Sequence, residues 1–364
     1  MALEFAQHVR RIPAYPAADG YALPEDVAML ASNESPFPPL PAVVEAARRA
    51  VETANRYPDP TNGRLRAALA DRYEVPAERI AIGNGSCDVL LAAGEALLEP
   101  GAEVVYAWPS FSVYPHLAAA TGATAVTVAL DAAARHDLDA IAEAVTVATR
   151  LVVVCNPNNP TATVVGLDAL AALVERVPRQ VCVIVDEAYC EFNVREDPDA
   201  SLALLREHPN VALLRTFSKV YGLAGLRVGF ALCGSTELRE AVDQVRQPFF
   251  CNVAAQAAAV EALRHQDEVT RRVEQTIAAR LELEEGLRHL GFDPSESQAN
   301  FVWFELGEDR PGEPRDEAAI VRGLAERGVL VRAGAALGRE GALRVTCGSG
   351  AENGRFLAAL GQIM

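Results

Sequence analysis

The sequence predicts an α/β protein in which a large doubly wound domain with a mainly parallel sheet is followed by a smaller α+β domain. Short apolar runs rich in β-branched residues alternate with helical periodicity, as strands and helices do in a doubly wound sheet. The chain of 364 residues is longer than one ordinary core requires. A long charged helix over residues 267–290 separates the alternating region from a tail of mixed strands and helices.

The expected elements, in chain order, set the domain boundaries. In the large domain, residues 45–265, strands are predicted at 103–108, 151–155, 181–185, 211–214 and 228–232, with helices at 166–177 and 236–245. The smaller domain, residues 266–364, holds the long helix, strands at 301–305, 329–332 and 343–347, and helices at 316–327 and 351–363. Residues 307–314 are expected to form a loop. Pro36, Pro38, Pro39 and Pro41 predict an extended N-terminal arm over residues 1–44.

Composition and charge narrow the function classes. The formal net charge of −16 repels nucleic-acid backbones, and no basic, aromatic-rich patch offsets it. Seven cysteines without a C-x-x-C pair and six histidines without metal-ligand spacing argue against disulfides and a metal site. No apolar stretch spans a bilayer, and the N-terminus lacks a signal-peptide core. We therefore expect a soluble, cytoplasmic protein that binds small molecules, not nucleic acid or membrane.

Lysine usage is the most informative single feature. The 33 basic residues comprise 32 arginines and one lysine, Lys219. Arginine serves ion pairs and solvated surfaces at least as well as lysine, but its guanidinium does not form imines as a primary amine does. The alternative is a surface lysine kept by chance, so the neighbours of Lys219 must decide.

Polar residues follow three of the expected strands, and in open α/β sheets ligands bind at these carboxyl ends. The segments are Asn156-Pro-Asn-Asn-Pro-Thr161, Asp186-Glu-Ala-Tyr189 and Arg215-Thr-Phe-Ser-Lys219. Asp186 alone would be interpreted as a helix cap or a structural ion pair. However, a carboxylate at the end of an apolar strand needs a cationic partner, and the only lysine is expected at the same edge.

An amine beside an acid suits pyridoxal phosphate (PLP). Lys219 would form an imine with the cofactor, and Asp186 would keep the pyridine nitrogen protonated so that the ring withdraws electrons from a substrate carbanion. Gly83-Asn-Gly-Ser-Cys-Asp88, followed by a helical stretch at 89–97, offers free backbone N–H groups for the phosphate. Arg227 is expected to add a bidentate charge to the same phosphate.

These residues resemble the fold-type I pyridoxal-phosphate aminotransferases, and among them the histidinol-phosphate aminotransferases most closely. The resemblance covers nearly the whole chain. It is carried by Asn33-Glu-Ser-Pro36, Arg56-Tyr-Pro-Asp59, Gly83-Asn-Gly-Ser86, Pro109-Ser-Phe111, Asn156 to Thr161, Asp186 to Tyr189, Ser218-Lys219, Ala224 to Gly229 and Leu343-Arg-Val-Thr346. It implies an aspartate-aminotransferase-like fold and a homodimer with shared active sites, in which the arm packs with the small domain and the partner.

The resemblance also implies residue roles. Lys219, Asp186 and Tyr189 would be catalytic, with Asp186 at the pyridine nitrogen. The implied cofactor contacts are Asn159 and Tyr189 at the ring hydroxyl, Phe111 on the ring face, Ser86, Cys87, Thr216, Ser218 and Arg227 at the phosphate, and Tyr57 from the other subunit. The implied substrate contacts are Tyr15, Asn33, Arg332 and Arg344.

Two positions depart from the family pattern. Ala162 stands where the family usually has glycine, and Cys87-Asp88 replaces the commoner Asp-Glu pair. Backbone amides bind anions whatever the side chain, so we expect the second change to spare the phosphate site. Alanine at position 162 costs little unless the backbone there needs a positive φ.

The predicted reaction is transamination between L-histidinol phosphate and 2-oxoglutarate, which gives imidazole-acetol phosphate and L-glutamate in histidine biosynthesis. Lys219 would anchor the cofactor and then move the proton between Cα and the cofactor. One alternative is an aromatic or other amino-acid aminotransferase, since the ring-binding residues do not distinguish substrate side chains. Another is a decarboxylase of a phosphorylated amino acid, since PLP stabilises whichever carbanion the protein orients. A non-enzymatic regulator would need a DNA-reading or partner domain for which the chain has no spare length.

Overall fold

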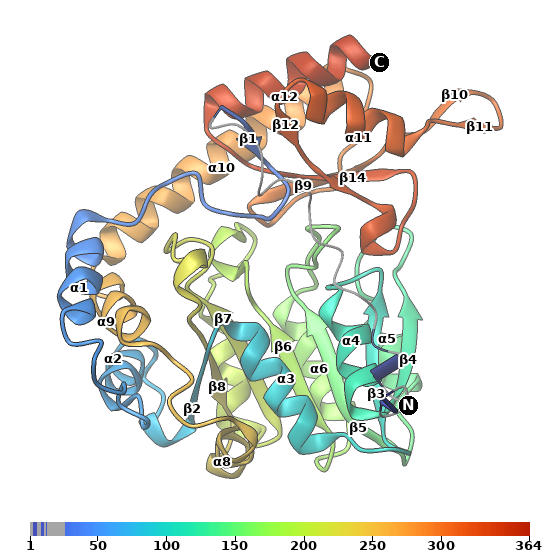
Figure 1. Cartoon of the computed structure of the whole chain (residues 1–364). Helices are drawn as coiled ribbons and strands as arrows, with labels where there is room; N and C mark the ends of the chain where they lie inside the picture. Colours follow the sequence, from blue (N-terminus) through green and yellow to red (C-terminus); the bar gives the residue numbers. More distant parts are fainter. Residues whose placement is uncertain (1–2, 6–8, 11, 13–25) are drawn as a thin grey trace.

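The structure is a computed structural model that describes residues 3–5, 9–10, 12 and 26–364. Its centre is a seven-stranded sheet in the order β2-β8-β7-β6-β5-β3-β4 (Figure 1). The strands are β2 (Ile80–Gly83), β3 (Glu103–Trp108), β4 (Thr124–Ala129), β5 (Thr149–Cys155), β6 (Cys182–Asp186), β7 (Val211–Thr216) and β8 (Gly229–Cys233). Only β8 runs against its neighbours. The predicted mainly parallel sheet is therefore confirmed.

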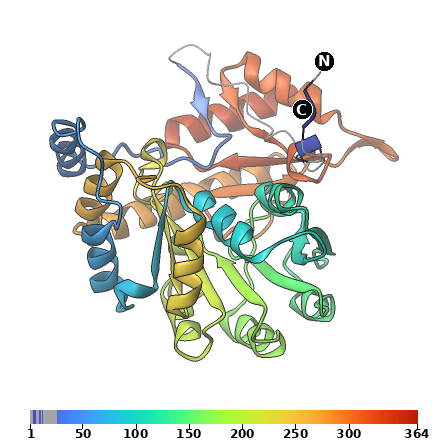
Figure 2. The same ribbon diagram turned by 60° about the horizontal axis from the view of Figure 1, so that its bottom comes forward.

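Helices cover both faces of this sheet (Figure 2). One face carries α3 (Ser86–Leu97), α4 (Val113–Thr121) and α8 (Thr236–Val245), which share one apolar cluster with the strands. The opposite face carries α1 (Pro41–Val51), α2 (Gly63–Tyr73), α5 (Leu138–Glu143), α6 (Leu167–Arg176), α7 (Leu204–Glu207) and α9 (Val253–Ala262) around a larger cluster. Because the central strands β5 to β8 are buried on both faces, apolar and polar residues do not alternate along them.

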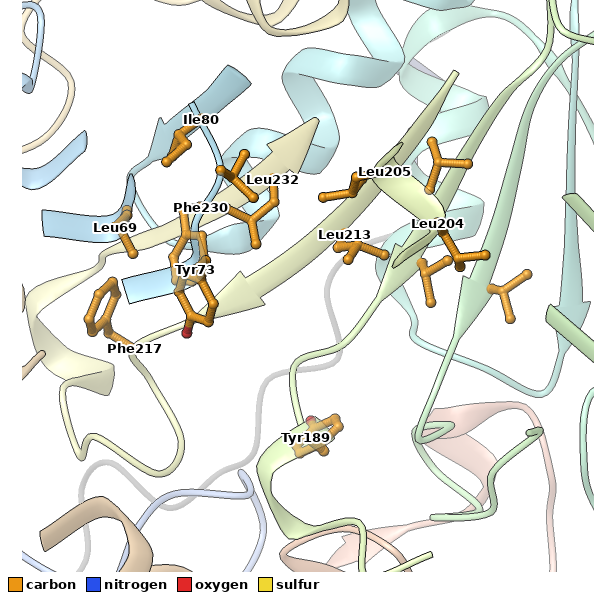
Figure 3. Close-up of a cluster of buried hydrophobic side chains, with 14 of the residues drawn as sticks. Leu69, Tyr73, Ile80, Tyr189, Leu204, Leu205, Leu213, Phe217, Phe230 and Leu232 are labelled. Atoms are coloured by element: carbon orange, nitrogen blue, oxygen red, sulfur yellow. The ribbon is translucent and has the colours of Figure 1, made fainter. Parts of the chain in front are cut away.

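Part of the larger cluster surrounds the strand that leads to Lys219 (Figure 3). The ring of Phe230 on β8 lies 5.5 Å from that of Tyr73 and 5.6 Å from that of Phe217, measured between centroids. Tyr189 lies apart from these residues in the same view and packs edge-on against Phe301, with 5.0 Å between ring centroids. This contact joins the sheet to the C-terminal part of the chain.

The C-terminal part begins with the long helix α10 (Gln266–His289). Its three-stranded antiparallel sheet has the order β13-β14-β9, formed by β9 (Phe301–Glu305), β13 (Arg332–Ala333) and β14 (Ala342–Thr346). The helices α11 (Glu317–Glu326) and α12 (Gly350–Ile363) pack with α10 around a third apolar cluster. The N-terminal strand β1 (Ala28–Met29) pairs in parallel with β12 (Val329–Leu330), so residues far apart in sequence share this unit.

The structure differs from the sequence prediction at several boundaries. The predicted arm ended at residue 44, but α1 already begins at Pro41, because proline is favourable in the first turn of a helix. The predicted loop 307–314 contains a hairpin of β10 (Glu308–Arg310) and β11 (Glu313–Pro314). The predicted strand 329–332 is split between β12 and β13, which belong to different sheets. Among the described residues, no helix combines the length and apolarity needed to cross a membrane.

Candidate active site

The carboxyl ends of β5, β6 and β7 face the C-terminal unit across a cavity of about 490 Å³. The predicted site residues that line it are Asn33, Ser86, Cys87, Phe111, Asn159, Asp186, Tyr189, Thr216, Ser218, Lys219, Arg227, Arg332 and Arg344. They come from both halves of the chain, and the fold brings them together because parallel strands end at one edge. Tyr15 lies outside the described residues.

Tyr57 does not line this cavity. Its side chain is 81% exposed, and its ring stacks on Phe249 with 4.5 Å between centroids. The predicted contact of Tyr57 with the cofactor of a partner subunit stays a prediction.

Lys219 lies in the turn that follows β7 and points its amine into the cavity. Burial, followed by the charge of Arg344, lowers the pKa of Lys219 to about 8. Its Nζ donates a hydrogen bond to the carbonyl oxygen of Ser32 at 3.2 Å and lies 5.6 Å from the centroid of the Tyr189 ring. A substantial fraction of this amine is therefore neutral near physiological pH, which is the form that attacks a carbonyl.

Asp186 is the last residue of β6 and is buried at the floor of the cavity. Its Oδ2 accepts a hydrogen bond from the Tyr114 hydroxyl at 3.0 Å, and its Oδ1 accepts one from the Ala188 amide at 3.3 Å. Burial raises the pKa of Asp186 to about 6. The sequence interpretation missed Tyr114, although its position three residues after Phe111 at the start of α4 was an available signal.

Hydrogen bonds tie the cavity walls together. Arg344 donates from Nη1 to Asn159 Oδ1 at 2.7 Å and from Nη2 to the Ala31 carbonyl at 2.5 Å. Asn33 Nδ2 donates to the Tyr189 hydroxyl at 3.0 Å. These bonds connect the N-terminal segment, β14 and the turn after β5. Side chains from distant parts of the sequence are thus held in fixed positions around Lys219.

Arg332 and Arg344 occupy directly opposite positions on the antiparallel strands β13 and β14. Like charges at opposite positions of an antiparallel pair destabilise it. Both side chains line the cavity, so a carboxylate bound there gains from both charges. This arrangement suits substrates that are amino or keto acids.

Buried hydrogen bonds fix the turn that presents Asn159. The neighbouring Asn158 is fully buried, and its Oδ1 accepts bonds from Ser110 Oγ at 2.7 Å and His136 Nε2 at 3.1 Å. Its Nδ2 donates to Thr161 Oγ1 at 2.8 Å. Because the amide oxygen only accepts, His136 carries its proton on Nε2. The sequence interpretation missed this network, since its partners meet only in the folded chain.

At Ala162 the condition under which alanine becomes costly is met. Ala162 has a φ of 61°, a left-handed conformation in which a Cβ costs about 1–2 kcal/mol. The glycine that is usual in the family avoids this cost.

The start of α3 forms a cradle for an anion. Its N-cap, Gly85, provides no side-chain hydrogen bond to the first turn, which leaves backbone N–H groups available. A Cβ on Gly85 would lie 2.3 Å from Arg227 Nη2, and one on Gly229 would lie 2.3 Å from the Ser86 amide nitrogen. The guanidinium of Arg227 and the amide of Ser86 therefore approach the same glycine-lined space, which fits a phosphate.

Comparison with known proteins identifies the family of this chain. Residues 25–360 match the family model of class I and II aminotransferases. The chain belongs to this family. The aminotransferase is 47% identical over 330 residues to the aromatic amino acid aminotransferase of Thermobifida fusca, covering 91% of this chain and 88% of the relative. It is 40% identical over 354 residues to the aromatic amino acid aminotransferase of Cutibacterium acnes, covering 97% of each.

Solved structures extend the comparison. The histidinol-phosphate aminotransferase of Sinorhizobium meliloti in complex with pyridoxal-5'-phosphate matches with a TM-score of 0.86 and 28% identity, covering 100% of this chain and 98% of that one. The predicted fold type, enzyme class and cofactor are confirmed: the protein is a fold-type I aminotransferase that uses PLP. The predicted histidinol-phosphate specificity is not supported, because the sequence relatives cited above are aromatic amino acid aminotransferases.

The residues of the cavity fit PLP. The cofactor needs a nucleophilic amine, an acid for the ring nitrogen and a site for a phosphate dianion. Lys219 supplies a buried amine of lowered pKa, Asp186 supplies a buried carboxyl group, and the start of α3 with Arg227 supplies the cradle. The same cavity contains all three features.

Proposed function

We propose that this aminotransferase transfers an amino group between aromatic L-amino acids and 2-oxoglutarate. The observation that carries the proposal is the specificity of the sequence relatives, which are 40% and 47% identical over nearly the whole chain and are aromatic amino acid aminotransferases. Identity of this extent preserves the residues that form a substrate pocket more often than a likeness of fold alone does.

The cavity lining also supports an aromatic side chain. Phe111 and Leu337 provide apolar surface within it, and the face of a substrate ring packs favourably on such groups. Arg332 and Arg344 supply cations for the carboxylates of the amino acid and of 2-oxoglutarate.

We assign the cofactor contacts to the residues that carry the family motifs. Asp186 holds the proton on the pyridine nitrogen, Asn159 and Tyr189 bind the ring hydroxyl, and Phe111 covers the ring face. The phosphate is held by the amides of Ser86 and Cys87 and by Thr216, Ser218 and Arg227. Bound PLP supplies an aldehyde and an electron-withdrawing ring. These residues would hold the cofactor within reach of Lys219.

Lys219 performs two tasks in this proposal. Its neutral Nζ first anchors the cofactor, and the incoming amino acid releases it. The freed Nζ then takes the proton from the substrate Cα and returns it on the cofactor side, as a general base whose pKa lies near the working pH. The carboxylate of the substrate is held by Arg344, which keeps Cα within reach of Nζ.

We further infer that the enzyme is a homodimer with shared sites. In such a dimer we expect the exposed Tyr57, stacked on Phe249, to contact the phosphate in the site of the partner subunit. A second copy would cover the ring of Tyr57, and burial of an exposed aromatic surface favours association.

The alternative substrate is L-histidinol phosphate, which is favoured by the similarity to the Sinorhizobium meliloti enzyme. The test compares kcat/KM for L-phenylalanine and L-histidinol phosphate with 2-oxoglutarate as acceptor. We expect phenylalanine to be preferred by about tenfold or more, a difference of about 1.4 kcal/mol in transition-state binding. A preference for histidinol phosphate would overturn the proposal. Release of carbon dioxide in place of glutamate formation would identify a decarboxylase instead.

A further inference from the structure

We propose that Tyr114 is a positioning residue that fixes the Asp186 carboxylate against the cofactor ring and keeps it ionised. The inference rests on the proposed role of Asp186 at the pyridine nitrogen. The Tyr114 hydroxyl donates to Asp186 Oδ2 at 3.0 Å, and the Ala188 amide donates to Oδ1 at 3.3 Å. Because each oxygen has its own donor from a different element, the plane of the carboxylate is fixed.

The position of Tyr114 is itself determined by close packing. Its side chain is fully buried, and its backbone N–H donates to the Phe111 carbonyl at 3.0 Å. Its ring meets that of Phe111 edge-on at 5.8 Å and that of Tyr106 at 5.6 Å. Tyr114 thus links the residue proposed to cover the cofactor ring with the residue proposed to bind its nitrogen, and one rigid turn places both.

Some neighbours of Asp186 raise its pKa and others lower it. The titratable groups that face it are Tyr114 from α4, Cys87 from α3, Cys155 from β5, Glu187 and Tyr189 from the segment after β6, and Lys219 from the turn after β7. Burial raises the pKa of Asp186 most, the hydrogen bonds from Tyr114 and the Ala188 amide lower it, the charge of Glu187 raises it and that of Lys219 lowers it. The net result is a pKa of about 6.

Toward the Asp186 carboxylate, the Tyr114 hydroxyl acts only as a donor. Burial raises the pKa of Tyr114 well above its usual value, so the hydroxyl keeps its proton at every pH at which the enzyme works. A hydrogen bond donated to a carboxylate favours the charged form. Without it, Asp186 becomes protonated at higher pH, and a neutral acid no longer stabilises a proton on the pyridine nitrogen.

A purely structural role is the alternative, because a buried hydroxyl needs an acceptor wherever it lies. The two roles predict different results. A structural tyrosine affects stability but not the pH dependence of cofactor binding. A positioning tyrosine shifts that pH dependence and lowers kcat more than it changes KM.

The test titrates the apoenzyme with PLP from pH 5 to 8 and compares wild type with Tyr114→Phe. Tyr106→Phe is the matched control, since it removes a hydroxyl from the same aromatic cluster. On the acid side, PLP binding weakens as the pH falls. We expect this decline, the acid limb, to occur about one pH unit higher in Tyr114→Phe, because a hydrogen bond to a charged group is worth about one pKa unit or more. We also expect kcat to fall about tenfold, with KM within twofold of the wild-type value. Tyr106→Phe should match wild type. An unmoved limb in Tyr114→Phe would overturn the inference.

A second variant covers the possibility that Tyr114→Phe does not fold. Incorporation of 3-fluorotyrosine at position 114 preserves the hydrogen bond and makes the hydroxyl a stronger donor. We expect it to move the acid limb to lower pH, and no movement would contradict the inference.

Wild-type protein that binds no PLP would overturn the proposed function itself. Binding of PLP with a preference for histidinol phosphate would overturn only the substrate assignment and leave this inference standing.

Discussion

We predict that the buried ion pair between Arg215 and Glu187 stabilises the ends of β6 and β7, which carry the site. Arg215 Nε lies 2.8 Å from Glu187 Oε2, and the two side chains are only 2% and 5% exposed. Glu187 directly follows Asp186, and Arg215 directly precedes Thr216. Arg215 also contacts Asp199, at 2.6 Å between Nη1 and Oδ1. The pair therefore ties the end of β6 to the end of β7 beside the cavity.

The burial of both side chains determines how much stability the protein should lose when the pair is broken. Glu187→Gln removes one charge and leaves the guanidinium of Arg215 buried with Asp199 as its carboxylate partner. Breaking a buried pair in this way costs roughly 3–5 kcal/mol. Since Asp199 still compensates part of the charge, we expect the lower end, about 3 kcal/mol. The matched control is Glu52→Gln, whose pair with Arg48 has a similar distance of 2.6 Å but 60% and 61% exposed side chains. That change should cost less than about 0.5 kcal/mol.

Urea unfolding of the apoenzyme measures both changes, with the fluorescence of the two tryptophans as the signal. The midpoint of Glu187→Gln should fall well below that of wild type at unchanged m-value, whereas Glu52→Gln should coincide with wild type. If the two variants lose the same stability, the reasoning from burial is wrong. A double variant, Glu187→Gln with Arg215→Met, should recover part of the loss, because it removes the uncompensated charge.

Two further predictions concern the cofactor. Gly85→Ala places a Cβ 2.3 Å from Arg227 Nη2, whereas Gly101→Ala meets nothing within 4 Å, although both glycines have positive φ, 89° and 98°. Both variants should lose about 1–2 kcal/mol of stability, but only Gly85→Ala should raise the dissociation constant of PLP, by about tenfold or more; equal affinities would contradict the proposed phosphate cradle. The second follows from the pKa of Lys219, lowered to about 8 mainly by burial. Because only the neutral amine attacks, the rate of PLP attachment measured by stopped-flow absorbance should be half-maximal near pH 8 and level off above about pH 9. Lys219→Arg should show no attachment. A rate that still rises at pH 10 would refute the assigned environment.

The sequence predicted five of the seven strands of the sheet and the residues that meet at its edge, because both are local patterns. Continuous apolar runs mark buried parallel strands. The polar residues that follow them lie at one edge of the sheet, whatever the conformation of the loops. The two edge strands were not predicted: β4 is largely exposed and lacks a continuous apolar run, and β2 has only four residues. Only the glycine that is usual in the family at this position pointed to the left-handed backbone of Ala162, because alanine itself does not indicate a positive φ.

Substrate specificity could not be derived from these patterns. The motifs report how the cofactor is held, and they are shared by enzymes that act on different amino acids. The prediction of histidinol phosphate followed the motifs, whereas the relatives with the cited identities of 40% and 47% are aromatic amino acid aminotransferases. Leu337, which lines the cavity beside these motif residues, belongs to none of the motifs.

The sequence by itself determined the chemistry, because a chain with one lysine has one side-chain amine to offer an aldehyde. Only the tertiary structure decided the environment of that amine. Burial and the charge of Arg344 lower the pKa of Lys219, and Arg344 is held by Asn159, which lies 185 positions away in the sequence. Solvent exclusion and contacts of such long range depend on how the whole chain packs.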